Sequence, residues 1–348
     1  WQRLLIMLGG ILVNILLAVV IYSFILFHWG EEKVPMQSLK NGIAFQDSLF
    51  YQVGLRNGDR IQQLDGQPVT YLDGVELKLI TSRSATVERD GRSVTIQFPV
   101  DLIGKLVEYK HKAKGALLIE PRLPAIVGSF DGITHSNAKD AGLKEGDKIM
   151  QVQGMPVTFF DQISTILKQD KKDTADLDIE RNGSPLHLRV KRMEDRKLGL
   201  PYIHDDQQLQ RMGILRVETH SYGLLACLPA GAMKTWQKLS EYIDQFRLIL
   251  TPKTGAYKGL GGFKAIANAF PSVWHWESFW NLTAYLSIIL AFMNLLPIPA
   301  LDGGHVLFTL YEIITRRKPS EKFLEYAQMV GMILLLALML FANANDWL

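Results

Sequence analysis

Long uncharged stretches flank a charged middle along the chain. Residues 4–27, 279–301 and 327–345 contain no Asp, Glu, Lys or Arg, whereas nearly all of the 38 basic and 35 acidic residues lie between positions 28 and 278. The hydrocarbon core of a bilayer is about 30 Å thick and needs roughly 20 apolar helical residues to cross it. The pattern therefore predicts three membrane-spanning helices, with one large water-soluble insert between the first and the second.

Basic residues beside these stretches predict the orientation of the helices. Arg3 precedes the first stretch, and Arg316, Arg317, Lys318 and Lys322 lie between the second and the third. Short loops rich in Lys and Arg stay on the cytoplasmic side. The two places are expected in the cytoplasm, and residues 28–278 and the C-terminal tail on the far side.

A region before the second predicted span is amphipathic. An uncharged stretch at 221–233, too short to cross a membrane, leads into apolar residues at three- and four-residue spacing: Trp236, Leu239, Ile243, Phe246 and Leu250. Charged residues occupy the other face. The pattern indicates a helix that lies at a membrane surface or packs on a neighbouring helix, with an ordinary helix of a soluble domain as the alternative.

The charged insert contains an internal repeat. Residues 53–69 align without gaps on residues 141–157, with identical residues at nine of the seventeen positions. Each copy later contains a hairpin-turn signal, Asp90-Gly91 in the first and Asn182-Gly183 in the second, between alternating strand-like runs. The insert is therefore predicted to hold two copies of a small domain of mixed strands and short helices.

The repeated motif Gly-Leu-x-x-Gly-Asp-x-Ile…Gly-x-Pro-Val resembles the PDZ domains of bacterial envelope proteases. That resemblance implies binding of a peptide as an added strand, with its C-terminal carboxylate held by backbone N–H groups. We expect the groove of the second copy near residues 126–128. The alternative is that the repeated glycines are turn formers without a ligand: Gly54, Gly58, Gly142 and Gly146.

Composition excludes several function classes. The net charge is +3 with both signs interspersed, so no basic face for nucleic acid is predicted. The single cysteine, Cys227, can form neither an internal disulfide nor a cysteine-based zinc site, and is expected to be a small buried side chain.

Candidate chemistry lies at the end of the second predicted span, where residues 294–305 read Asn-Leu-Leu-Pro-Ile-Pro-Ala-Leu-Asp-Gly-Gly-His. Pro297 and Pro299 each remove a backbone donor, so the helix should open at about membrane depth. Asp302 follows 23 uncharged residues, and an ionisable group near the bilayer indicates a functional site. The alternative places Asp302 in a loop at the cytoplasmic surface.

The string Asn-x-x-Pro-x-Pro-x-Leu-Asp-Gly-Gly-His resembles the second metal-binding motif of site-2 proteases, the intramembrane zinc metalloproteases. The resemblance implies that Asp302 is a zinc ligand and that Asn294 lies close to the active site. Residues 9–14, Gly-Gly-Ile-Leu-Val-Asn, are similar to the Gly-x-x-x-Asn segment of the family. The order of segments is that of the bacterial enzymes that cleave membrane-anchored anti-sigma factors.

The fold class expected from this resemblance is an α-helical membrane protein, with three spans here and four in the full length, and two inserted PDZ-like α+β domains. The expected parts are a transmembrane helix at 1–27, a first PDZ domain at 28–115, a second at 116–205, an amphipathic helix and glycine-rich re-entrant segment at 206–278, and two transmembrane helices with the motif at 279–348. The family implies a bacterial inner-membrane protein with its PDZ domains outside the cytoplasm.

One departure from the family bears on the chemistry. Family members carry His-Glu-x-x-His on a preceding helix, whose two histidines bind zinc while the glutamate acts as general base. No such string occurs here, and the eight histidines are scattered. We expect the helix with that motif to precede Trp1, so that this chain alone cannot complete the site.

Three further polar or glycine-rich positions have open roles. His305 is expected to make a local hydrogen bond rather than to replace a zinc ligand. Asn14 either makes a packing hydrogen bond or supports the active site. Residues 259–262, Gly-Leu-Gly-Gly, lack the lysine and strand of a phosphate loop and indicate a flexible or re-entrant segment beside the active site.

Two functions follow. The first is a zinc endopeptidase that performs regulated intramembrane proteolysis of single-pass membrane substrates, with the PDZ pair controlling access as a size filter or by binding the C-terminus left by an earlier cut. The second is a non-catalytic membrane-anchored scaffold whose PDZ pair holds peptide partners. A transporter is less favoured, because three spans contain no repeated half.

Overall fold

The protein is described by a computed structural model, which covers residues 2–106, 118–133, 135–194, 196–203, 206–270 and 274–346. The chain forms two compact units. One contains Trp1–Glu32, Ile103–Glu108 and Thr219–Leu348, and the other contains Lys33–Leu102 and Tyr109–Glu218.

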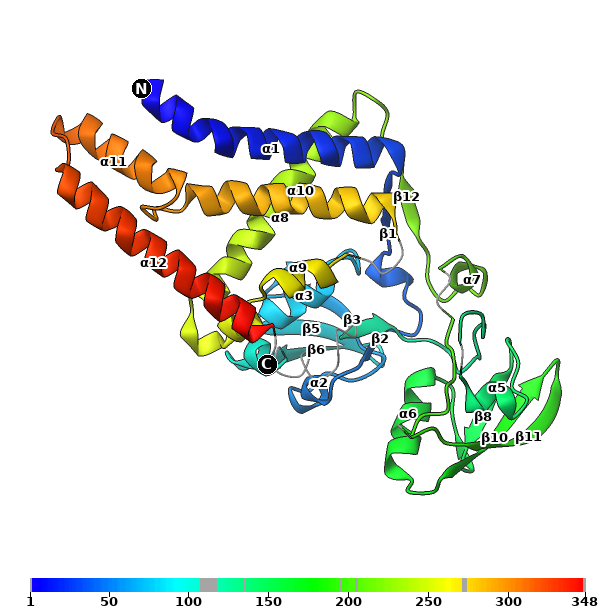
Figure 1. Cartoon of the computed structure of the whole chain (residues 1–348). Coiled ribbons are helices and arrows are strands. Elements are labelled where there is room, and N and C mark those ends of the chain that lie inside the picture. The colour runs from blue at the N-terminus through cyan, green and yellow to red at the C-terminus, as the bar shows by residue number, and fades with distance from the viewer. Residues whose placement is uncertain are drawn as a thin grey trace. The chain divides into compact units, whose positions relative to one another are not determined.

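The first unit is built mainly from helices (Figure 1). Its elements are α1 (Gln2–His28), β1 (Glu31–Lys33), β12 (Glu218–His220), α8 (Cys227–Ile249), η2 (Pro252–Thr254), η3 (Ala256–Gly259), α9 (Phe263–Asn268), α10 (Trp276–Leu295), α11 (Asp302–Thr315) and α12 (Glu321–Asn345). β1 and β12 form a two-stranded sheet where the chain leaves and re-enters this unit.

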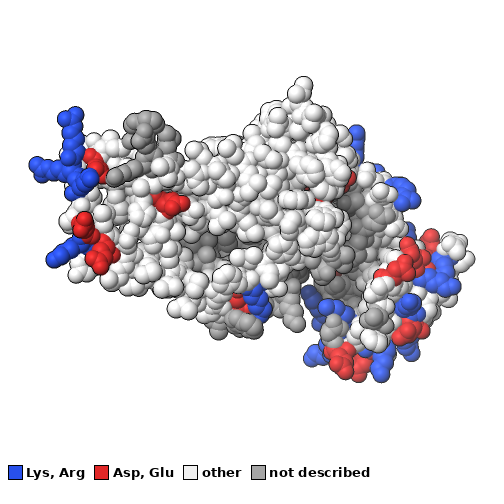
Figure 2. All heavy atoms as spheres, turned by 45° about the horizontal axis from the view of Figure 1, so that its top comes forward, with Lys and Arg blue, Asp and Glu red and all other residues white. Residues whose placement is uncertain are grey.

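Three helices of this unit are long and apolar enough to cross a membrane: Ile6–His28, Trp276–Leu295 and Glu321–Asn345. They confirm the predicted spans. In the most apolar stretch of α12, only 6% is buried inside the protein, so most of the apolar surface of this helix is available to contact lipid. Figure 2 shows charged side chains gathered at the end where α11 meets α12, beside a wide uncharged surface along the helices.

The second predicted span ends six residues earlier than expected. α10 stops at Leu295 rather than at residue 301, and a separate helix, α11, starts at Asp302. Pro297 and Pro299 have no N–H to continue the α10 ladder, so the backbone from 296 to 301 forms a loop. The predicted opening is thus confirmed, whereas the second helix after it was not foreseen.

The helix core lies where α1 meets α10. Ala18, Tyr22 and Ile25 of α1 pack with Ala284 and Ile288 of α10, and all five are buried. The two helices lie side by side in Figure 1.

The predicted amphipathic helix is α8, and it packs on α1 and α10. Its Gly231 is so close to Ser23 of α1 that an added Cβ would overlap the Ser23 side chain and backbone. Nearer its end, Tyr242 and Phe246 place their rings 5.3 and 5.2 Å from that of Phe292 on α10. Of the two expected settings, packing on neighbouring helices is therefore observed.

The second unit contains the two repeats. The first repeat comprises η1 (Met36–Ser38), β2 (Ile43–Phe45), α2 (Ser48–Gln52), β3 (Arg60–Leu64), β4 (Gln67–Pro68), α3 (Val75–Thr81), β5 (Ser84–Arg89), β6 (Arg92–Gln97) and β7 (Ile119–Pro121). The second comprises α5 (Asn137–Asp140), β8 (Lys148–Val152), β9 (Met155–Pro156), α6 (Phe160–Gln169), β10 (Thr174–Arg181) and β11 (Ser184–Lys191), followed by α7 (Asp206–Arg211).

The two repeats have the same sheet. Strand order is β4-β3-β5-β6 in the first and β9-β8-β10-β11 in the second, antiparallel throughout. The turns that join the last two strands are the predicted ones, because both central residues have positive φ: Asp90 and Gly91, and Asn182 and Gly183. Apolar side chains from α6 and the strands, including Ile149, Ile163 and Leu177, form the core of the second repeat.

A buried ion pair is duplicated as well. Arg181 contacts the Asp147 carboxylate at 2.7 Å and donates to the carbonyl of Gly142, and Arg89 does the same with Asp59 and Gly54. The Asp147 side chain is only 1% exposed. Each pair ties the hairpin to the Gly-Leu-x-x-Gly-Asp turn, which gives the repeated aspartate a structural role.

This pair predicts an acid-sensitive contribution to stability. Burial opposes the charge on Asp147, but hydrogen bonds from Arg181 and the Lys144 N–H outweigh it and lower the pKa of Asp147 below its ordinary value. A carboxylate with a lowered folded-state pKa stabilises the fold at neutral pH, and the stabilisation is lost as pH falls below about 4. We expect Asp147→Asn to cost about 2 kcal/mol at pH 7.

Hydrogen exchange of β8 and β10 in the whole protein measures this cost. The matched control is Asp176→Asn, which removes a carboxylate of the same sheet that is 29% exposed. At pH 7, Asp147→Asn should lose more protection from hydrogen exchange than the control does. The difference in protection between Asp147→Asn and the wild type should become smaller as the pH is lowered towards 3. An equal loss in both variants would contradict the assignment.

Residues 126–128, where the peptide groove of the second copy is expected, already have backbone partners. Val127 exchanges backbone hydrogen bonds with Asp147 and Gly146 on one side, while the Gly128 N–H donates to the Pro201 carbonyl on the other. Pro201 therefore occupies the second edge at Gly128, and a groove near this segment stays a prediction.

Candidate functional site

The candidate site is the loop between α10 and α11. The Leu296 N–H donates to the Met293 carbonyl at 3.1 Å and ends α10, and the Ile298 N–H turns back to Leu296 at 2.7 Å. The Leu301 N–H donates to Ile298 at 2.8 Å just before α11 starts. Short local hydrogen bonds therefore replace the helical ladder that the prolines interrupt.

Three glycines let other backbone approach this loop closely. A Cβ on Gly303 would overlap the carbonyls of Leu295 and Leu296, and one on Gly304 would lie 2.5 Å from the Pro299 Cα. From α12, a Cβ on Gly331 would lie 2.9 Å from the Ala300 nitrogen. The Gly-Gly of the motif thus allows α11 to start against the loop. Gly331 was missed, although a glycine inside a long apolar helix is a signal of close packing.

Asp302 is the first residue of α11, and its side chain reaches α1. A Cβ on Gly10 would lie 3.6 Å from the Asp302 Oδ2. Among the described residues the carboxylate has no hydrogen-bond or ion-pair partner, and the residue is half-buried. The structure therefore brings together the two segments that carried the family resemblance, and among the described residues the carboxylate is left without a partner beside α1.

The two asparagines lie on helices beside this point. Asn294 occupies the last turn of α10 and is half-buried. Asn14 of α1 is also half-buried, and its carbonyl accepts a hydrogen bond of 2.9 Å from the Ser287 hydroxyl of α10. The backbone of Asn14 thus makes a packing contact, and both side-chain amides lack a partner among the described residues.

His305 contacts α12 rather than Asp302. Its Nε2 lies 3.5 Å from the Gln328 Nε2, and its carbonyl accepts from the Thr309 hydroxyl. The ring therefore joins the starts of α11 and α12.

The donor set at the loop is incomplete for zinc. A catalytic zinc takes three protein ligands and a water, whereas within the described ranges no group of three or more His, Cys, Asp or Glu side chains could hold a metal ion. His111 and His204 lie outside those ranges. Within the described ranges, Asp302 is thus the one carboxylate at this loop that the family resemblance names as a metal ligand.

The glycine-rich segment packs against the far end of α12. Asn345 donates to the carbonyls of Lys258 and Leu260, and an added Cβ on Gly262 would lie 2.6 Å from the Asn343 Oδ1. Asn343 is twelve residues from Gly331, which is about 18 Å along the helix. The segment is therefore not beside Asp302, contrary to expectation.

Asp346 holds the start of α9 at this end. Its carboxylate accepts from the backbone N–H groups of Gly262, Ala265 and Lys264, and these bonds lower the pKa of Asp346. The residue was not singled out from sequence, because its partners lie some eighty residues away.

The structure thus combines a broken helix at the Asp302 loop with an inserted pair of β repeats. The family model "Peptidase family M50" matches residues 1–338. The chain belongs to this family of site-2 proteases.

Individual proteins that are similar to this chain also have names of proteases. "Putative zinc metalloprotease Cj1068" of Campylobacter jejuni is 33% identical over 226 residues, which are 61% of this chain and 57% of that protein. "Regulator of sigma-E protease RseP" of Escherichia coli is 27% identical over 361 residues, 99% of this chain and 78% of that protein. A similarly named zinc metalloprotease of Xylella fastidiosa is 25% identical over 375 residues.

Proposed function

We propose that this protein is a zinc endopeptidase that cleaves single-pass membrane proteins within the bilayer. The observation that carries the proposal is the unpaired Asp302 carboxylate at a loop between membrane helices, beside Gly10 of α1. Family membership supports it. The name of the Escherichia coli relative further supports anti-sigma factors as the substrate type.

Asp302 would be one of the protein ligands that hold the zinc. Bound zinc supplies an activated water for attack on a peptide carbonyl. The residues described here would position the zinc ligand, the loop and the substrate. The start of α11 fixes Asp302, the glycine contacts fix the loop, and the Asn294 amide lies on the helix turn just before the loop, where it can hydrogen-bond an unwound substrate backbone.

The packing of α8 supports a positioning role for that helix. Tyr242 and Phe246 enclose Phe292, which lies two residues before Asn294 on α10. Through this contact α8 restrains the last turns of the helix that leads into the loop.

The repeats are proposed to be PDZ domains outside the cytoplasm that control substrate access. The shared sheet order and the repeated Gly-Leu-x-x-Gly-Asp turn support the PDZ assignment. Orientation rests on the exposed basic residues between α11 and α12, which favour the cytoplasmic side of a bacterial inner membrane: Arg316, Arg317, Lys318 and Lys322.

Zinc removal separates this proposal from a non-catalytic scaffold. In proteoliposomes that contain the full-length protein and a single-pass reporter, 1,10-phenanthroline should reduce cleavage at least about 100-fold, since metal activation of water is worth several kcal/mol. Added Zn²⁺ should restore it. Reporter binding without any metal-dependent cleavage would favour the scaffold.

A further inference from the structure

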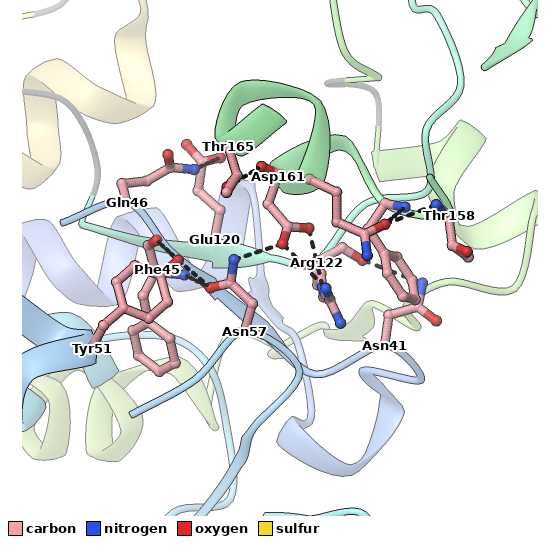
Figure 3. A network of polar contacts seen from close by, with 12 residues as sticks. Asn41, Phe45, Gln46, Tyr51, Asn57, Glu120, Arg122, Thr158, Asp161 and Thr165 are labelled. Atoms are coloured by element: carbon pink, nitrogen blue, oxygen red, sulfur yellow. Dashed lines mark hydrogen bonds and ion pairs between the residues drawn. The ribbon is translucent and has the colours of Figure 1, made fainter. Parts of the chain in front are cut away.

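The two repeats of the second unit are joined by a buried ion pair. Arg122 follows β7, in the connection between the repeats, and Asp161 lies in the first turn of α6 in the second repeat. The Arg122 Nε and Nη2 donate to the two Asp161 oxygens at 3.0 and 3.2 Å, and the guanidinium lies 3.9 Å from the centre of the Phe159 ring. Both charged side chains are about 15% exposed or less, so the pair is largely shielded from water (Figure 3).

The first repeat contributes an amide to the same carboxylate. The Asn57 Nδ2 donates to the Asp161 Oδ2 at 2.6 Å. Its Oδ1 accepts from the Phe45 N–H and the Tyr51 hydroxyl, at 2.8 and 2.9 Å. These two bonds fix the orientation of the amide, so the Asn57 Nδ2 already points at Asp161 of the second repeat.

The connection is fixed to the first repeat by its backbone as well. The Arg122 N–H donates to the Gly42 carbonyl at 2.9 Å, and the Asn41 side chain donates to the Arg122 carbonyl at 3.2 Å. The Arg122 side chain extends from this anchored point to Asp161. Loss of the ion pair would therefore detach α6 both from the first repeat and from the connecting segment that contains Arg122.

Comparison of the repeats shows that these contacts are specific to the first copy. In the seventeen-residue alignment Asn57 corresponds to Glu145, which is exposed. Gly58 corresponds to Gly146, and both have positive φ. A Cβ on Gly58 would lie 3.1 Å from the Arg122 Nη1, whereas a Cβ on Gly146 would meet nothing within 4 Å.

We infer that Asn57, Arg122 and Asp161 form an inter-repeat clamp that holds the two repeats at one fixed orientation. Domains within one chain move relative to each other by default unless their interface is large and hydrophobic. Here a bidentate arginine–carboxylate pair that is largely shielded from water and receives a third hydrogen bond restrains this motion with directional geometry instead. If the proposed function holds, the clamp fixes the size of substrate that the repeats admit, but the orientation itself can be tested without proteolysis.

Distances between spin labels test the clamp in the full-length protein in detergent micelles. Labels are attached at Gln97→Cys in the first repeat and Ser164→Cys in the second, both exposed positions, with buried Cys227 replaced by serine. Asp161→Asn and Arg122→Gln should each widen the inter-label distance distribution at least about twofold. The double variant should be no wider than either single variant, because both remove the same contact.

Arg189→Gln is the matched control, since it removes an arginine that is 67% exposed from an ion pair within the second repeat. It should leave the distribution unchanged. An unchanged distribution in Asp161→Asn would overturn the clamp.

Alanine variants of Gly58 and Gly146 give a second test, which does not depend on whether Asp161→Asn folds. Gly58→Ala and Gly146→Ala carry a similar backbone strain at positive φ. An alanine at position 58 would place its Cβ 3.1 Å from the Arg122 Nη1 and crowd the guanidinium, so this variant should widen the distribution more than Gly146→Ala. Equal effects of the two alanines would overturn the inference, even if Asp161→Asn fails to fold.

Discussion

Asp302→Asn in the full-length protein is expected to abolish proteolysis and to release zinc. Asparagine keeps the size of the side chain but removes the charge that a zinc ligand needs. Loss of metal activation costs on the order of 4 kcal/mol in the barrier, so cleavage should fall at least about 1,000-fold. Zinc content by mass spectrometry and cleavage of a single-pass reporter measure the two effects.

Glu312→Gln is the control for Asp302→Asn. Glu312 is a half-buried carboxylate on the same helix, ten residues further along. This variant should keep the zinc and the activity of the wild type. Equal zinc content in Asp302→Asn and the wild type would remove Asp302 from the metal site.

Gly303→Ala should produce the second large effect. Its methyl group would overlap the carbonyls of Leu295 and Leu296, which belong to the end of α10 and the loop and cannot swing aside as a side chain can. Overpacking of this kind costs about 3 kcal/mol. We expect the loop to move, with cleavage falling at least about 100-fold, a change of roughly 3 kcal/mol in the barrier.

Gly9→Ala is the matched control in α1, because an added Cβ there meets nothing within 4 Å. Alanine in a helix interior stabilises by up to about 1 kcal/mol relative to glycine. Gly9→Ala should therefore unfold at or slightly above the wild-type temperature and cleave the reporter like the wild type, whereas Gly303→Ala should be lower in both measurements. Full activity of Gly303→Ala would show that the close approach at the start of α11 is not needed.

Local patterns in the sequence predicted the features that depend on local chemistry. Uninterrupted apolar runs predicted the three spans, because a bilayer selects for length and absence of charge. Pro297 and Pro299 predicted the break in the helix, because a missing N–H acts at its own position. Asp90-Gly91 predicted its hairpin, because both residues must accept positive φ.

Features that depend on distant partners could not be predicted in this way. α11 was not predicted as a helix, because it begins with Asp302, Gly303 and Gly304, which are poor helix formers. Nothing in residues 126–128 themselves indicates that the Gly128 N–H bonds to Pro201, which is far away in the chain. Asn57 differs from Glu145 within the aligned motif, yet its partner Asp161 is 104 residues away in the chain.

The β1–β12 pair has a consequence for how such a chain could arise and diversify. These two strands bring residues 31–33 beside residues 218–220, so the two ends of the segment that contains both repeats lie side by side. Entry and exit points that lie side by side allow a domain to be inserted or exchanged without moving the helices that flank it. Domains between β1 and β12 can therefore be gained, lost or exchanged in evolution, while the helices on either side keep their connections.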